Sequence, residues 1–226
     1  MRRGRARQRA LQGLETRRRL LEVSLRLFVR QGYAGTTVRD IAGAARVSVG
    51  LMFHYFPSKQ ALLQEHARSM RHGIAAVARL LAAAGPPLDR FTTVARTVLQ
   101  SLGDESTRQL FLLVNQVLMF ESVPRSVRRL VSSTSSIDAS VPLIRSGQRR
   151  GLIKRGDPRA LAVAFWGALQ GIAEVLVWYP TASIASPETV VDILRARPVR
   201  SVRVAPPRDR RSQRAAPPAG PRSGAA

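Results

Sequence analysis

The chain has 226 residues, 45% of them hydrophobic, so it can bury a core and is not a globally disordered protein. It contains no cysteine, which excludes disulfides, thiolate metal sites and cysteine nucleophiles. The formal net charge is +23, and much of it lies at the two ends: residues 1–19 hold eight arginines, and residues 195–226 hold nine. Such a charge suits nucleic acid, but arginine outnumbers lysine 35 to 2, which fits a GC-rich genome equally well.

The N-terminal residues 1–13 show no apolar periodicity, and we expect them to form a basic flexible arm. From near Thr16 to Phe28, apolar residues recur at helical spacing. Gly32 then suits the left-handed position that closes a helix. A first helix between these limits is predicted.

Two short helices follow, joined by a tight turn. The first begins with the capping-box pattern Thr-Val-Arg-Asp at Thr37, and Ser48 is placed to cap the second, expected over residues 49–55. Pro57 disfavours helical geometry at the residue before it and ends the second helix. Ser58 caps a longer helix. This arrangement is the sequence outline of a helix-turn-helix.

The remaining sequence is helical in pattern, and no run alternates with the period of a strand. We expect Pro142 to kink or split one of the helices. Residues 198–226 are rich in Arg, Pro, Ala and Ser, and we expect a disordered tail there. Helices are predicted at residues 74–84, 88–102, 104–121, 124–149, 158–179 and 187–196.

One apolar segment, residues 161–179, raises the question of a membrane span. Gln170 and Glu174 interrupt it, and a carboxylate at mid-bilayer costs about 2–3 kcal/mol or more. The charged start of the chain leads into no apolar run before Leu20, so it does not have the pattern of a signal peptide. We therefore expect a buried packing helix in a cytoplasmic protein, with no membrane partner.

Several positions of the helix-turn-helix coincide with a known pattern at fixed spacing. They are Gly32-Tyr-Ala-Gly-Thr-Thr-Val-Arg-Asp-Ile-Ala42, then Ala45-Arg-Val-Ser48, Gly50, and His54-Tyr-Phe-Pro-Ser-Lys59-Gln-Ala-Leu62. This pattern resembles the DNA-binding domain of the TetR family of transcriptional regulators over residues 14–74, with essentially no gap. The resemblance implies an all-α protein: an N-terminal three-helix helix-turn-helix domain, then a helical ligand-binding and dimerisation domain at residues 75–197. It implies a repressor that leaves double-stranded operator DNA when a small-molecule effector binds.

The resemblance also implies which residues contact DNA. The second short helix enters the major groove with its first turn, while the first short helix and the start of the fourth helix lie beside phosphates. His54 has an alternative role as a stacked surface histidine. The residues implied to face the groove are Ser48, Val49, Gly50 and Leu51, and those implied beside the backbone are Thr37, Arg39, His54, Tyr55, Ser58 and Lys59.

Three residues depart from the family pattern. Arg46 stands where the family usually has a turn glycine, so a non-glycine residue is expected to hold a positive φ at a cost of about 1 kcal/mol. Contact of Arg46 with DNA and simple tolerance of the turn both remain open. Phe53 replaces a tyrosine whose hydroxyl commonly meets phosphate. Leu51 replaces a small polar residue, so it can contact a thymine methyl group.

A weaker resemblance covers the later helices through Ile144-Arg-Ser-Gly-Gln-Arg-Arg-Gly151, Asp157-Pro158, Trp166-Gly167 and Gln170-Gly171. It implies a homodimer in which the last long helices pair. Candidate dimerisation residues are Leu161, Phe165, Gly167, Ala168, Gly171 and Val175. Residues that either line an effector pocket or simply fill the core are Leu113, Gln116, Met119, Phe120, Phe165, Trp166, Glu174 and Trp178.

Other classes of function have little support in the sequence. His66 and His72 are six residues apart with no carboxylate partner, so we expect no metal site, and no cofactor motif is present. No arrangement of nucleophile, base and acid indicates an enzyme. The arginine-rich ends leave one competing hypothesis, an architectural nucleic-acid binder with weak sequence preference.

Overall fold

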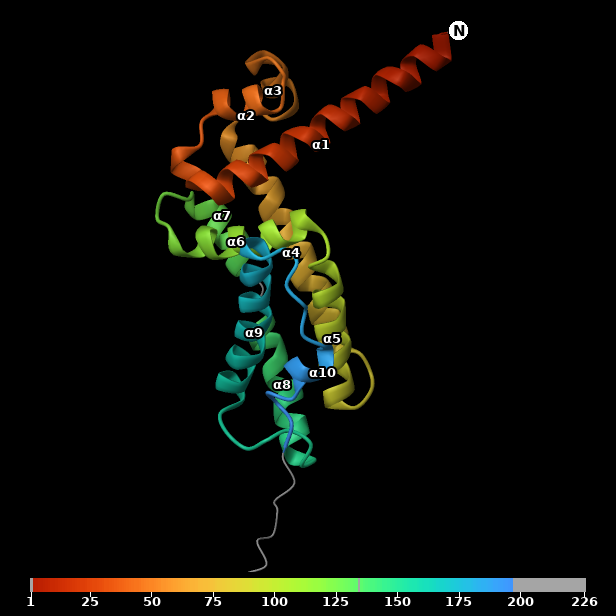
Figure 1. Ribbon diagram of the computed structural model, residues 1–226, viewed down its shortest axis with the longest axis vertical. Helices are drawn as coiled ribbons and strands as arrows, with labels where there is room; N and C mark the ends of the chain where they lie inside the picture. The colour runs from red at the N-terminus through yellow and green to blue at the C-terminus, as the bar shows by residue number, and fades with distance from the viewer. Residues whose placement is uncertain (1, 134, 197–226) are drawn as a thin grey trace, which may run out of the picture. The chain divides into compact units, whose positions relative to one another are not determined.

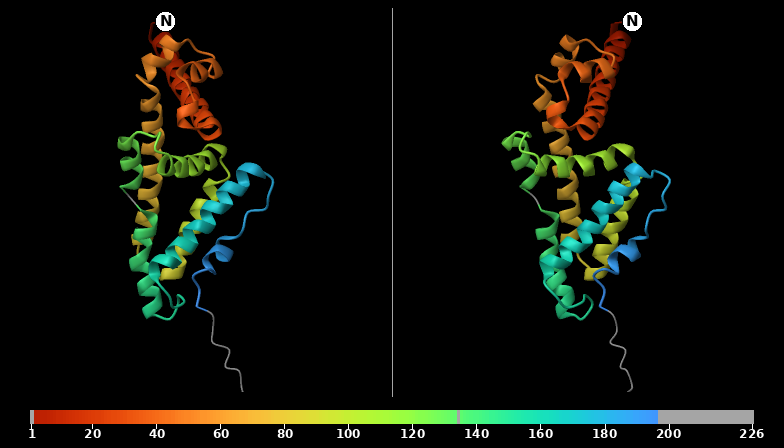
Figure 2. Two further views of the ribbon diagram at one scale, coloured as in Figure 1. Left: turned by 90° about the vertical axis from the view of Figure 1, so that its left-hand side faces the viewer. Right: turned by 60° about the vertical axis from the view of Figure 1, so that its left-hand side comes forward.

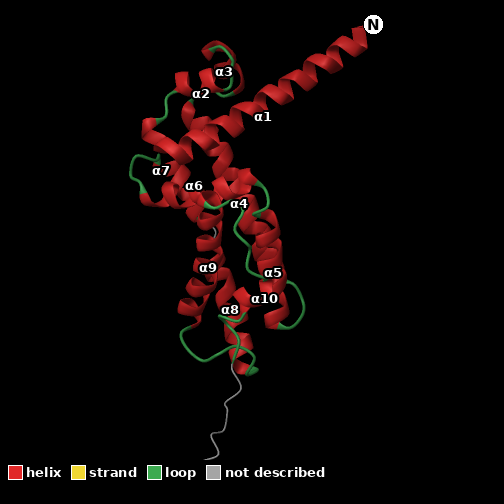
Figure 3. Cartoon of the chain, viewed as in Figure 1, coloured by secondary structure: helices red, strands yellow, loops and turns green. Residues whose placement is uncertain are grey.

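The computed structural model describes residues 2–133 and 135–196, and Figure 1 shows them as a succession of helices. The only extended pairing in this part of the chain is an isolated antiparallel bridge between Ile153 and Arg195, and Figure 3 shows no strand. The predicted all-α class is confirmed, and the tail expected at 198–226 lies outside the described residues. The helices are α1 (Arg2–Gly35), α2 (Val38–Ala44), α3 (Val49–Tyr55), α4 (Lys59–Ala82), α5 (Pro87–Ser101), α6 (Glu105–Met119), α7 (Arg125–Ser132), α8 (Ser136–Arg149), α9 (Pro158–Trp178) and α10 (Pro187–Val191).

The start of the chain differs from the flexible arm that we expected. The described residues 2–13 continue helix α1, which is interrupted only at Gly32 (φ 72°). This segment is rich in Arg, Ala, Gln and Leu, all good helix formers, and it has no proline. Once packing fixes the later turns of α1, each added residue extends the helix without a new nucleation step.

Two hydrophobic cores hold the helices together. The N-terminal core gathers side chains of α1 to α4 around Phe28, Ile41 and Leu63. The C-terminal core joins the end of α4 with α5, α8, α9 and α10 around Phe91 and Phe165, whose rings meet edge to face at a centroid distance of 5.0 Å. Each core excludes water from a contiguous set of apolar side chains and so stabilises its own group of helices.

The N-terminal core does not end where the sequence suggested a domain boundary. Residue 74 lies inside α4, which runs through both cores. Leu113 and Val117 of α6, with Val127 and Val131 of α7, are buried in the N-terminal core. The domain boundary at residue 74 therefore stays a prediction, and residues on both sides of it pack in the same N-terminal core.

Helix α6 links the two groups of helices by polar contacts as well. The Gln116 side-chain amide donates to the carbonyl oxygen of Val29 in α1 at 2.9 Å, and Asn115 donates to Glu174 of α9 at 2.9 Å. Gln170 of α9 donates to a backbone carbonyl of α6 at 3.2 Å. Figure 2 shows α6 lying between the N-terminal helices and the end of α9.

The helix predicted over residues 124–149 is split, but not at Pro142. Helices α7 and α8 are separate, and Ser135 caps α8 by accepting from the Asp138 backbone amide at 3.1 Å. Pro142 lies inside α8 on an exposed side, where the hydrogen bond that it cannot donate faces solvent. The serines before α8 favour capping over helix continuation, which explains the position of the break.

Helix α9 is long and apolar enough to cross a membrane by composition alone, with a mean hydropathy of 1.8. The two polar residues in its second half are partly buried and used within the chain: Gln170 and Glu174 both bond to α6, as described above. Leu169, Ala173 and Leu176 on the same helix are buried in the C-terminal core. These contacts agree with the predicted packing helix.

A buried histidine lies in the N-terminal core between α1 and α4. His66 Nε2 is 3.0 Å from Ser24 Oγ, and that hydroxyl already donates to the Leu21 carbonyl at 2.9 Å. A hydroxyl has one proton, so the ring nitrogen is the donor. Burial lowers the pKa of His66 from 6.5 to about 4, against a smaller opposite effect of Glu65.

We predict that acid destabilises the protein through His66. Below pH 6.5 the unfolded chain protonates this ring while the folded chain does not, so stability is lost as pH falls from 6.5 towards about 4. The shift corresponds to roughly 3 kcal/mol. Urea unfolding at several pH values should show this loss in the wild type and not in His66→Gln. Parallel pH profiles of the two proteins would contradict the assignment.

Candidate nucleic-acid interface

Helix α2 begins with the predicted capping box. The Asp40 amide donates to Thr37 Oγ1 at 3.1 Å, and the Thr37 amide donates to Asp40 Oδ2 at 2.8 Å. These hydrogen bonds lower the pKa of Asp40 below its usual value, because they favour the charged carboxylate. Thr37 and Arg39 are both exposed at the start of α2. Their contact with a DNA backbone stays a prediction.

The turn between α2 and α3 is closed by backbone hydrogen bonds. Val47 N donates to the Ala42 carbonyl at 3.0 Å, and Arg46 N donates to the Gly43 carbonyl at 3.0 Å. Arg46 has φ 52°, so the expected left-handed conformation of this non-glycine residue is confirmed. Its exposed side chain makes no hydrogen bond or ion pair with a described residue, which leaves both interpretations of Arg46 open.

Helix α3 has one inward side and one outward side. Ser48 caps it by accepting from the Leu51 amide at 3.1 Å, as predicted. Met52 is fully buried in the N-terminal core, and it is the only buried residue of the helix. The outward side chains are apolar and exposed to 37% at Val49, 40% at Leu51 and 45% at Phe53. Gly50 beside them leaves the backbone open to close approach, since no atom lies near its missing Cβ.

The end of α3 carries two aromatic rings predicted to lie beside phosphate. His54 is exposed, and its ring meets that of Tyr55 edge to face at 5.2 Å. Tyr55 is half-buried against α1, where a Cβ added at Gly13 would lie 3.3 Å from its hydroxyl oxygen. The structure therefore shows the stacking that was the alternative role of His54, and it leaves the ring free on its outer side.

At the start of α4, Lys59 makes contacts within the chain, and its implied place beside a DNA phosphate stays a prediction. The ammonium group donates to the carbonyl oxygens of Tyr33 and Thr36, both at 2.7 Å, and lies 4.3 Å from the centroid of the Tyr33 ring. Partial burial lowers the pKa of Lys59. Lys59 thus fastens α4 to the connection between α1 and α2. Ser58 caps α4 by accepting from the Ala61 amide at 3.0 Å.

Sequence reasoning missed the residue that anchors α1 beside this site. Arg17 forms an ion pair with Glu65 of α4 at 2.7 Å, and its guanidinium carbon lies 5.2 Å from the centroid of the Phe56 ring. The next two residues are also arginines, so nothing in the local pattern distinguishes Arg17. The pair holds α1 against the segment that follows α3.

The candidate effector residues are not gathered into one pocket. Leu113 and Phe165 are buried in different cores. Gln116 bonds to Val29, Trp166 donates to Ser140 Oγ at 2.9 Å, and Glu174 bonds to Asn115. The remaining three candidates are exposed at the surface: Met119, Phe120 and Trp178.

The candidate dimerisation residues fall on two sides of α9. Leu161 and Phe165 are buried in the chain's own core and cannot form an outer apolar surface. Ala168 and Gly171 are partly buried, while Gly167 and Val175 are exposed. The outer face of α9, defined here as the α9 stripe, consists of Val163, Ala164, Gly167, Gly171, Val175 and Trp178, which recur every three or four residues. The sequence does not indicate which face of α9 points inward, because this helix is apolar nearly all round.

Comparison with known proteins identifies the type of the helix-turn-helix. Residues 20–66 match the family model described as bacterial regulatory proteins, tetR family. The helix-turn-helix region of the chain is therefore of the TetR type. The chain is 44% identical over 78 residues to the HTH-type transcriptional regulator BetI of Agrobacterium fabrum, covering 33% of this chain and 38% of BetI. It is 35% identical over 85 residues to the HTH-type transcriptional repressor KstR2 of Rhodococcus jostii, covering 38% and 41% of the two chains.

Solved structures extend the likeness in fold to both groups of helices. The MbdR regulator from Azoarcus sp. CIB has a TM-score of 0.67 at 22% identity, covering 81% of this chain and 100% of that one. AibR in complex with isovaleryl coenzyme A and operator DNA has a TM-score of 0.60 at 21% identity, covering 78% and 94%. At 21% and 22% identity these structures show the fold alone. The two curated relatives named above are matched over less than half of their own length.

We predict that Arg46→Gly raises the free energy of unfolding by about 1 kcal/mol, because glycine adopts a positive φ without steric cost. Arg39→Gly is the matched control: Arg39 lies within α2, where glycine should lower stability by roughly 0.5–1 kcal/mol. Thermal unfolding of both variants measures the difference. An Arg46→Gly protein that melts at or below the wild-type temperature would show that the turn is not strained.

Proposed function

We propose that this protein is a sequence-specific DNA-binding transcriptional regulator and that α3 reads bases in the major groove. The observation that carries the proposal is the outward face of α3, where Val49, Leu51 and Phe53 are exposed although they are apolar. A short helix held by one buried residue and presenting its first turn outward suits a groove about 12 Å wide. Apolar side chains there favour contact with thymine methyl groups.

Repression relieved by a small molecule is the regulatory mode that we infer. KstR2 is named a transcriptional repressor, and AibR was solved with both an acyl coenzyme A and operator DNA. The shared packing of α6 supports a link between ligand and DNA, because this helix contacts α1 through Gln116 and α9 through Asn115. An effector that favours another position of α6 would lower operator affinity by its difference in affinity for the two states. Such a regulator acts in the cytoplasm and needs no catalytic group.

A homodimer is the form that we infer for binding. The α9 stripe leaves Val163 51% and Trp178 78% exposed, which is costly for apolar side chains in a monomer. Gly167 and Gly171 in the stripe have no atom near their missing Cβ, so a second helix can approach closely. Two copies of α3 one DNA turn or a multiple apart would read a palindrome.

We predict that Val163→Asp shifts the protein towards monomer, because a carboxylate in a helix-helix interface loses its hydration without a partner. The side chain is half-exposed in one chain, so the fold should survive. Ile184→Asp, at 43% exposure in the loop before α10, is the control for an added surface charge. Sedimentation equilibrium at micromolar concentration measures the mass. Equal masses for the two variants would exclude the α9 stripe as the interface.

We also predict that Leu51→Asp abolishes preference for specific DNA without unfolding the protein. Leu51 is exposed in the first turn of α3, where an acidic residue suits the helix dipole but is repelled by phosphate and finds no hydrogen-bond donor at a thymine methyl. The test begins with selection of duplexes from a random pool by the purified wild type. The variant should bind the recovered duplex no better than random competitor, whereas Ile184→Asp should keep the preference.

The same selection separates a regulator from an architectural binder. A regulator enriches a defined site. An architectural binder enriches none, and scrambled DNA displaces it as well as any selected duplex does. Absence of any enriched site, or an unchanged preference in Leu51→Asp, would overturn the proposed function.

A further inference from the structure

Helix α1 continues well beyond the core that it helps to build. Its last anchors towards the N-terminus are Gly13, beside the Tyr55 hydroxyl, and Arg17, paired with Glu65. Residues 7–12 are all exposed. Residues 2–12, here called the N-terminal segment, add eleven helical residues, which at 1.5 Å each extend the axis by about 16 Å. The described side chains of this segment, those of residues 7–12, therefore lie on the surface without packing that explains the helix.

The N-terminal segment starts beside α3, the helix proposed to read bases. Tyr55 is the last residue of α3, and its contact with Gly13 fixes the point at which α1 passes that helix. Figures 1 and 2 show the N-terminus of α1 at the same end of the molecule as α2 and α3. A duplex held by α3 is thus within reach of the segment. A length of about 16 Å spans several phosphates, since duplex DNA carries one charge per about 1.7 Å of its axis.

The charge of the segment is one-sided. Residues 2–12 contain five arginines and no acidic residue, and the described side chains of Arg7 and Arg9 are exposed and form no ion pair with a described residue. The first carboxylate along α1 is Glu15, and it is already engaged by Arg18 at 2.7 Å, which lowers the pKa of Glu15. Arg7 and Arg9 therefore carry unpaired positive charge among the described residues, next to the predicted DNA site.

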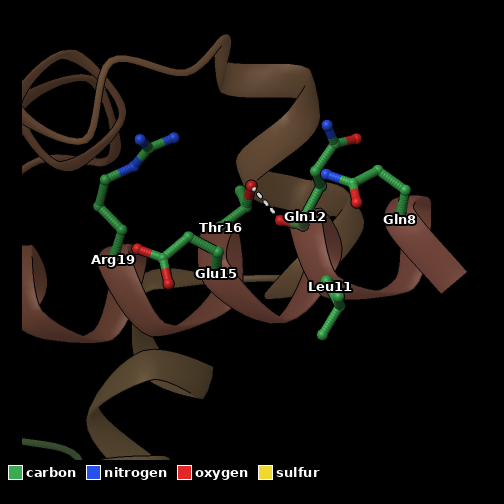
Figure 4. Close-up of a pocket in the computed structure, with 6 residues that line it drawn as sticks. All are labelled: Gln8, Leu11, Gln12, Glu15, Thr16 and Arg19. Atoms are coloured by element: carbon green, nitrogen blue, oxygen red, sulfur yellow. Dashed lines mark hydrogen bonds between the residues drawn. The ribbon is translucent and has the colours of Figure 1, made fainter.

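A shallow, open hollow along the same helix adds neutral donors to this charge. Gln8, Gln12 and Arg19 line it together with Leu11, Thr16 and Glu15, the carboxylate that Arg18 already engages (Figure 4). Amide and guanidinium groups in a row donate hydrogen bonds to phosphate oxygens without reading sequence. The row continues from the N-terminal segment towards the anchored part of α1.

From these observations we propose that the N-terminal segment of α1 binds phosphates of the duplex that flanks the bases read by α3. The inference rests on the proposed function and deepens it. The binding site on DNA is then longer than the sequence recognised, and part of the affinity is independent of sequence. Because each neutralised phosphate releases counterions, the segment also raises the salt dependence of binding.

The test compares two charge-matched variants on two lengths of DNA. In the first variant Arg2, Arg3, Arg5, Arg7 and Arg9 become glutamine, which keeps chain length and helix propensity. In the control, the five arginines changed to glutamine are Arg203, Arg208, Arg210, Arg211 and Arg214 near the C-terminus. The probes are the duplex recovered by selection from a random pool, once with flanks of about one helical turn and once trimmed to the recovered site.

Trimming should weaken binding of the wild type and of the control variant by roughly tenfold, and it should leave the first variant unchanged. The slope of log affinity against log salt should be smaller in the first variant by about 0.9 for each phosphate that the segment no longer neutralises. An equal effect of trimming on all three proteins, or an equal decrease of affinity in both variants, would overturn the inference. If the first variant still prefers the recovered site over random duplex, only the inference fails and the proposed function stands. Failure of the wild type to enrich any duplex would overturn both.

Discussion

The structure of the N-terminal group of helices depends on the burial of Met52. Helix α3 has seven residues, too few to be stable alone, and Met52 is the only one whose side chain is buried. Its position in the N-terminal core, together with Ile41 and Phe56, sets the rotation of α3 about its own axis. That rotation places Val49, Leu51 and Phe53 outward. The same apolar contacts therefore determine both the stability of the fold and the face that it presents.

Helices α6 and α7 contribute side chains to the N-terminal core and so connect α1 to α4 with the rest of the chain. Leu113 and Val117 occupy the core on one side of α6, while Asn115 bonds to α9 on another. Packed helices move between discrete arrangements rather than deforming smoothly, so a displacement of α6 must disturb α1 or α9. The buried Gln116 Oε1, which has no hydrogen-bond partner among the described residues, lies at this joint. A buried acceptor without a partner raises the free energy of this arrangement.

Local patterns were sufficient to predict the helix-turn-helix. Capping at Thr37 and Ser48 depends on a side chain and a backbone amide three residues apart, and the positive φ of Arg46 was expected because the residue stands where the TetR family usually has a turn glycine. Features that depend on distant contacts were not predictable in the same way. The carbonyl oxygens that hold Lys59 belong to Tyr33 and Thr36, more than twenty residues away, and only the folded chain brings them together.

The later helices show the same limit. The inward face of α9 is ambiguous in a helix with apolar residues on all sides, so Leu161 and Phe165 were assigned to an outer surface that they do not reach. The position of the break between α7 and α8 depends on serine capping at Ser135, which competes with the effect of Pro142. The helical start of α1 could not be read from hydrophobic periodicity, because the described side chains there, those of residues 7–12, are exposed.

The placement of α3 in a DNA groove can be measured directly because the chain contains no cysteine. Leu51→Cys supplies a single thiol on the exposed face of α3, to which an iron chelate that cleaves DNA by hydroxyl radicals can be attached. On the duplex recovered by selection, cleavage is expected at discrete positions within the recognised sequence, in two symmetry-related clusters. Cleavage spread evenly along the duplex, or indistinguishable from that of Ile184→Cys, would contradict recognition by α3.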